Sequence, residues 1–129
     1  AIVGTVSSNS ISFGTAVVFE SAATESIAAT FDTNSNKVVL CYKDSGNSSR
    51  GTSIVGTVSG TGISFGSAVV FDTSTASDLS ATFDTDTNKV IFAYQQGGTN
   101  TGRAVVGAVS GTNISFGSTV QLSLYVSRL

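Results

Sequence analysis

One twelve-residue motif, present three times, constrains the fold of this chain more than any other feature. Its second copy, residues 55–66, reads VGTVSGTGISFG, and related copies occupy residues 3–14 and 106–117. The copies are offset by 52 and then by 51 residues. Self-similarity at a fixed period indicates one supersecondary unit copied along the chain, which buries its apolar face against neighbouring copies.

The segments between the motif copies repeat as well, and they read as short β-strands. Turns rich in Gly, Asn and Asp separate the strands expected in one unit, which are 27–32, 37–43, 52–59 and 63–71. A small polar connector is expected at 21–26. The sequence predicts ten strands and no helix, arranged as a half repeat 1–20, repeats 21–71 and 72–122, and a tail 123–129.

Composition narrows the class of protein and of partner. The chain is 40% hydrophobic and 11% charged, and Ser, Thr, Gly and Val dominate, which favours strands over helices. Its net charge of −2 and its six scattered cations argue against a nucleic-acid partner. No run approaches the ~20 apolar residues of a membrane helix, so no membrane partner is expected. The absence of His excludes imidazole metal ligation and His-dependent nucleophiles, and we predict no metal and no cofactor.

The strand at 37–43 carries apolar side chains on both faces, with Val38 and Leu40 on one side and Val39 and Cys41 on the other. A sheet with one wet face alternates polar and apolar residues, so this sheet is expected to be covered on both sides. The predicted fold is all-β, with four-stranded antiparallel sheets stacked face to face, as in the blades of a β-propeller. A β-sandwich or a β-solenoid is the alternative. Cys41 is expected to be inert core.

Two stretches resemble β-propeller blades, the hairpin 83–94 and the pair of strands that ends at 60–66. The resemblance is to sialidase-like repeats, propeller lectins and repeat arrays of bacterial or phage surface proteins, and it covers about residues 1–122. It implies an extracellular location or a place on a cell or virion surface. The chain departs from the sialidase Asp-box, Ser-x-Asp-x-Gly-x-Thr-Trp, because it has no Trp.

Two and a half blades do not close a ring, since propellers have four to eight. Terminal units without a neighbour expose apolar faces. We therefore expect a homo-oligomer that completes the ring, with a dimer of roughly five blades favoured over a trimer. The alternative is a fragment of a longer array, because the chain has no Met and begins inside a repeat.

Two acidic triplets have the spacing that opens a calcium loop, at 32–36 and at 84–88. The Gly required at the sixth position is Lys37 in one triplet and Lys89 in the other. Asp and Asn also cap tight turns with their own side chains. We interpret both triplets as hairpin turns rather than as metal sites.

Candidate ligand-binding residues come from the ends of equivalent strands and from the loops that follow them. Aromatic faces stack on sugar rings, and amide or guanidinium groups bond to hydroxyls. A carbohydrate site between blades would use Tyr42, Tyr94, Asn47, Arg50, Asn100 and Arg103. The competing interpretation is that both tyrosines are core and both arginines are solvated.

These observations favour a non-enzymatic surface or structural repeat protein, with carbohydrate as a possible ligand. One alternative is a fragment of a propeller glycoside hydrolase, in which Asp32 or Asp84 would supply a catalytic carboxylate. Another is a scaffold of a phage or cell-surface fibre that binds no ligand.

Overall fold

The structure, a computed structural model, describes residues 1–123. The predicted all-β fold is confirmed, and every strand pair in this part of the chain is antiparallel. The elements in chain order are β1 (Gly4–Ser7), β2 (Ser10–Phe13), β3 (Thr24–Asp32), β4 (Lys37–Asp44), the 3₁₀ turn η1 (Ser45–Asn47), β5 (Arg50–Ser59), β6 (Gly62–Phe65), β7 (Val69–Asp84), β8 (Lys89–Gln96), β9 (Thr101–Ser110), β10 (Asn113–Phe116) and β11 (Val120–Ser123).

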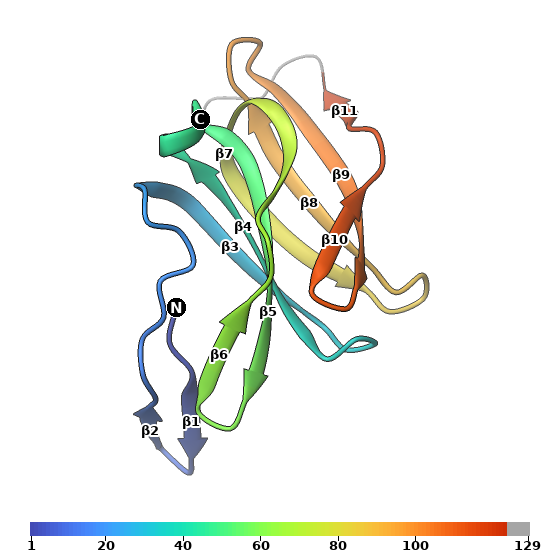
Figure 1. The fold of residues 1–129 in the computed structure, drawn as a ribbon. Coiled ribbons are helices and arrows are strands. Elements are labelled where there is room, and N and C mark those ends of the chain that lie inside the picture. Colours follow the sequence, from blue (N-terminus) through green and yellow to red (C-terminus); the bar gives the residue numbers. More distant parts are fainter. Residues whose placement is uncertain (124–129) are drawn as a thin grey trace.

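The strands form two layers and a separate hairpin (Figure 1). The first layer consists of β3, β4 and β5, with β6 and the start of β7 along the outer edge of β5. The second layer consists of the rest of β7 with β8 and β9, and β10 and β11 share the outer edge of β9. Strands β1 and β2 form the separate two-stranded sheet. Each layer therefore has the four-strand order that the repeat predicts.

Two details differ from the sequence prediction. The strand expected at 63–71 is split, because β6 ends at Phe65 and pairing with β5 resumes only at Val69. Residues 73–78, which correspond in the second repeat to the connector expected at 21–26, are part of the continuous strand β7. This strand bends through a bulge near Asp78. Asp78 has φ 52, and Ser26 at the same place in β3 has φ 50, so a left-handed residue makes the bend in both layers. The equivalent strand of the last unit is divided into β10 and β11, so residues 1–123 hold eleven strands instead of ten.

The core lies between the two layers. Val39, Cys41, Val55 and Phe71 of the first layer pack against apolar side chains of the second layer, which include Val90, Phe92, Tyr94 and Val105. The opposite face of the first layer holds Leu40, Tyr42 and Ile54, covered by Phe19 and Phe65. Strand β4 is therefore buried on both faces, as its sequence predicts. The stack is open, and residues 1–123 close no barrel or ring (Figure 1).

Candidate functional site

The two tyrosines of the predicted carbohydrate site lie in the core. Tyr42 is 0% exposed and Tyr94 is 4% exposed. Phe19 packs edge-on against Tyr42, and Phe71 packs in the same way against Tyr94, each with ring centroids 5.2 Å apart. Neither ring offers a face to a sugar in this structure, which agrees with the competing interpretation of both tyrosines as core.

Tyr94 is held by a buried acid that the sequence analysis did not single out. Its hydroxyl donates a 2.6 Å hydrogen bond to Oδ2 of Asp72, which also accepts from Nε2 of Gln96 at 3.1 Å. The other oxygen of Asp72 accepts from the backbone N–H of Ser74 at 2.8 Å. Burial and the bond to Asp72 raise the pKa of Tyr94 above its ordinary value.

The first layer keeps only the backbone bond of this arrangement. Glu20 takes the place of Asp72, and its Oε1 accepts from the backbone N–H of Ala22 at 2.9 Å. The Tyr42 hydroxyl is buried and has no hydrogen-bond partner among the described residues. Burial raises the pKa of Tyr42 to about 12, and the nearby charges of Glu20 and Asp44 add to the shift. The sequence carries one signal of this arrangement, an acidic residue that directly follows Phe19 and, one repeat later, Phe71.

The two asparagines and two arginines expected in the loops do not form matching pairs, and both arginines lie in strands, Arg50 in β5 and Arg103 in β9. Nη1 of Arg50 lies 3.5 Å from Oδ1 of Asn47, so these two residues are brought together. Asn100 instead accepts a hydrogen bond from the Gln95 side chain at 3.4 Å. Nη1 of Arg103 donates to Oγ1 of a threonine at 3.4 Å, Thr119.

The expectation that both arginines occupy equivalent positions is wrong. Arg50 lies opposite Asp44 across the β4–β5 pair, whereas Arg103 lies opposite Tyr94 across the β8–β9 pair. The loop before β9 is one residue shorter than the loop before β5, and the register of β9 places Arg103 where the first layer has Thr52. The two arginines therefore recur in the sequence but do not occupy equivalent positions in the two layers.

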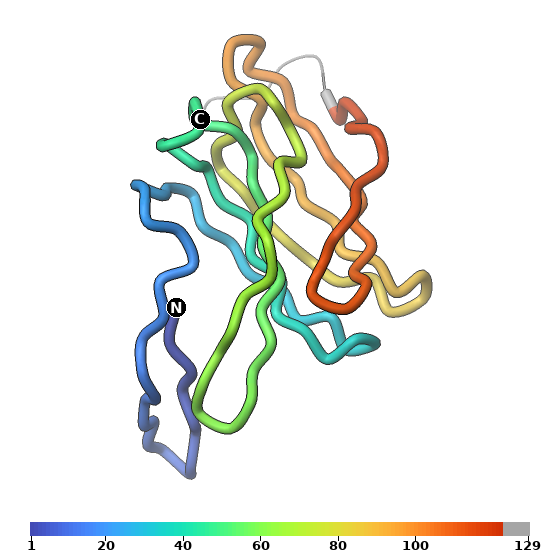
Figure 2. The backbone as a smooth tube through the Cα atoms, in the orientation of Figure 1, coloured from blue at the N-terminus to red at the C-terminus, as the bar shows by residue number. Residues whose placement is uncertain are grey.

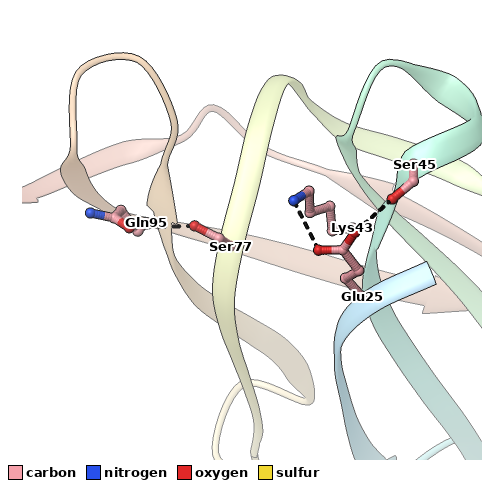
Figure 3. Close-up of polar contacts among 5 residues, drawn as sticks. All are labelled: Glu25, Lys43, Ser45, Ser77 and Gln95. Atoms are coloured by element: carbon pink, nitrogen blue, oxygen red, sulfur yellow. Dashed lines mark hydrogen bonds and ion pairs between the residues drawn. The ribbon is translucent and has the colours of Figure 1, made fainter. Parts of the chain in front are cut away.

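One cross-strand pair differs in charge between the two layers, but its side chains are in contact in both (Figure 3). In the first layer Lys43 Nζ lies 3.1 Å from Oε2 of Glu25 directly across the strand pair. The second layer has Ser77 and Gln95 at these places, joined by a 3.4 Å hydrogen bond. The Lys43 ammonium holds the pKa of Glu25 below its usual value, but the pair is solvated and contributes little to stability.

The two acidic triplets are capped turns. Oδ1 of Asp32 accepts from the backbone N–H groups of Asn34 and Ser35 at 2.9 and 3.0 Å. Oδ1 of Asp84 accepts from the backbone N–H of Asp86 at 3.0 Å. Both carboxylates also accept a 2.6 Å hydrogen bond from a hydroxyl three residues on. These bonds are those expected of a turn in which the side chain of the first residue caps backbone N–H groups two or three residues on.

The described part of the chain shows no other chemical centre. No three Cys, Asp or Glu side chains among residues 1–123 lie close enough together to hold a metal ion, and no pocket is present there. No helix in residues 1–123 is long and apolar enough to cross a bilayer. Cys41 is buried, and burial raises its thiol pKa to about 12, so the thiol stays protonated at neutral pH.

The repeated motif builds a second kind of site, the junction between successive hairpins. In each hairpin the backbone N–H of the last glycine donates to the first valine's carbonyl, at 2.9, 2.9 and 3.0 Å for Gly14, Gly66 and Gly117. Two of these glycines then meet the turn of the next hairpin. A Cβ atom on Gly14 would collide with the Thr61 carbonyl oxygen, and one on Gly66 would collide with that of Thr112. The three hairpins accordingly point the same way, each beside the next (Figure 2).

Aromatic rings complete the same junctions. Phe19 contacts the ring of Phe65 at 5.8 Å between centroids, and Phe71 contacts Phe116 at 5.7 Å. Each ring belongs to one unit and packs on the tyrosine and the phenylalanine of the next. The glycine and aromatic contacts therefore recur in register at both junctions, and the sequence alone does not show which residues of the motif make them.

Comparison of the chain with protein-family models, with curated proteins and with solved structures found no match. The fold and the junctions define the chain as an all-β repeat protein, and its function is inferred from its own residues.

Proposed function

We propose that this chain is a non-enzymatic structural repeat module of a surface or fibre protein, whose units act by stacking on one another. One observation carries the proposal: the residues that recur are engaged in contacts between units. Gly14 and Gly66 receive the turn of the following hairpin, and Phe19 and Phe71 cover the tyrosine of the following layer.

Within this proposal the layers are blades of the propeller type. Each layer has four antiparallel strands in sequential order, and successive layers pack face to face. The strand that leaves one layer, β7, becomes the first strand of the next layer without a helix or long loop. This short connection favours stacking of consecutive units side by side, as blades stack.

The polar groups that an enzyme or a lectin would use are engaged in contacts within the chain. Asp32 and Asp84, the acids of the hydrolase alternative, cap their own turns. Asp72 is bonded to Tyr94, and both tyrosine rings are buried. Carbohydrate binding stays a prediction that concerns only the asparagines and arginines of the candidate site, because the expected stacking faces of the tyrosines are not accessible.

A screen of the full chain against a glycan array and a panel of glycoside substrates tests the proposal. A scaffold gives neither saturable binding nor turnover. Binding that is lost in Asn100→Ala and kept in the turn variant Thr33→Ala would transfer the function to carbohydrate recognition. Hydrolysis that is lost in Asp84→Asn would make the chain an enzyme and overturn the proposal.

A further inference from the structure

The last hairpin presents a junction surface that no residue of the described part of the chain covers. No described atom lies within 4 Å of the position a Cβ would take on Gly117, although Gly14 and Gly66 are covered at the same place. Val106 is 47% exposed, whereas Val55 at the same place in the first layer is 0% exposed. Leu122 occupies the place of Phe71 and is 62% exposed. Val106, Gly117 and Leu122 form what we call the open C-terminal face.

The first hairpin presents the opposite half of the junction. Phe13 is 61% exposed, although Phe65 and Phe116, at the same place in the later hairpins, pack against the phenylalanine of the preceding unit. Ile2 is 47% exposed, at the place where the later units bury an isoleucine and a valine. Asn9 lies at the exposed turn, where the later hairpins carry the threonine that meets a glycine. Ile2, Asn9 and Phe13 form the open N-terminal face.

We propose that the open N-terminal face of one copy of this chain docks on the open C-terminal face of a second copy. The turn at Asn9 would seat on Gly117, and Phe13 would pack on Leu122. The occupant follows from the chain itself, because the same contact occurs twice inside it, at Gly14 with Thr61 and at Gly66 with Thr112. This inference rests on the proposed stacking function and names the partner and surface that stacking implies.

The contact joins two different surfaces, so it is head-to-tail. Such interfaces build a closed ring when the rotation between copies closes and an open filament when it does not. The apolar side chains at both faces are those whose burial drives association. The exposed backbone at Gly117 makes the contact sensitive to one methyl group, because a β-carbon there would meet the docking turn as it would at Gly66.

Sedimentation equilibrium of the full chain over a wide concentration range tests the inference. The wild type is expected to form multiples of the chain mass, and Gly117→Ala to weaken association by about tenfold or more, the size of one central contact. Phe13→Ser should weaken it similarly. Gly62→Ala is the matched control, because a Cβ on Gly62 meets only Ser59 O at 3.6 Å, in ordinary contact.

Two results would overturn the inference. One is a wild type that stays monomeric at every concentration, and the other is association that Gly117→Ala and Phe13→Ser leave unchanged, which would place the interface elsewhere. The stacking function has a separate readout, the loss of monomer stability in Gly66→Ala. A stable Gly66→Ala monomer counts against both proposals, whereas a destabilised Gly66→Ala with a monomeric wild type counts against docking alone.

Discussion

Adding one methyl group to the repeated glycine should destabilise the chain at one place and not at another. In Gly66→Ala the new Cβ is directed at the Thr112 carbonyl oxygen and lies 3.0 Å from the Thr112 Cβ. Both obstacles belong to a backbone turn, which cannot swing aside as a flexible side chain does. In Gly117→Ala the new Cβ meets no described atom within 4 Å, and its φ is not in the left-handed region.

The expected magnitudes follow from overpacking and from the unfolded state. Forcing a methyl group into a filled site costs about 1–3 kcal/mol. Replacing glycine by alanine also restricts the unfolded chain, which stabilises the fold by about 0.4–1 kcal/mol where the backbone allows it. Gly66→Ala should therefore lower the free energy of unfolding by about 1–2 kcal/mol. Gly117→Ala should leave it unchanged or raise it by up to about 1 kcal/mol.

The assay is urea unfolding of the two variants and the wild type, followed by circular dichroism at the lowest usable concentration, where association contributes least. The two variants carry the same substitution in the same motif, so propensity cancels and the difference reports the junction. Equal free energies of unfolding for Gly66→Ala and Gly117→Ala would refute the assignment of Gly66 to a packed junction.

Three further predictions follow from the buried groups. Tyr94→Phe should destabilise the chain by about 1–3 kcal/mol in the same urea assay, because it leaves Asp72 without its 2.6 Å donor. Tyr42→Phe should be neutral or stabilising, since the Tyr42 hydroxyl has no partner among the described residues. Phe71→Ala should cost about 3–5 kcal/mol by calorimetry, as the ring is buried against three aromatic rings, and a loss below about 1 kcal/mol would contradict that packing. Stability should be full below about pH 9 and fall as the pH rises toward 12, because folding raises the pKa of Cys41 from 9.0 and of Tyr42 from 10.0 to about 12. The native state then holds protons that the unfolded state releases. Urea midpoints that stay constant over this pH range would refute the prediction.

The sequence predicted the fold where periodicity carried the information. Alternating turns and β-branched runs located the strands, and the two apolar faces of β4 predicted a sheet covered on both sides. The continuous course of β7 was not predictable in the same way. Its middle is Ser- and Thr-rich and reads as a loop, but pairing with β5 and then with β8 keeps it extended. Long-range pairing overrode the local signal.

The candidate site was harder to predict because it depends on what lies across from each residue. Tyr42 and Tyr94 end strands in the sequence, and only packing shows that Phe19 and Phe71 cover them. Gly66 reads as the end of a hairpin, and its role appears only when the next hairpin is placed against it. A sequence shows that residues recur, whereas the structure shows which recurring residues meet.

The most direct test of stacking through the repeated hairpins is a nuclear Overhauser spectrum of the isotope-labelled chain. Stacking predicts cross-peaks from the α-protons of Gly14 to Thr61 and from those of Gly66 to Thr112, because each pair is in contact across a junction. In a dilute sample Gly117 should show no matching cross-peak, and one to Asn9 should emerge as the concentration rises. A well-folded chain that lacks both the Gly14–Thr61 and the Gly66–Thr112 cross-peaks would contradict the stacked arrangement.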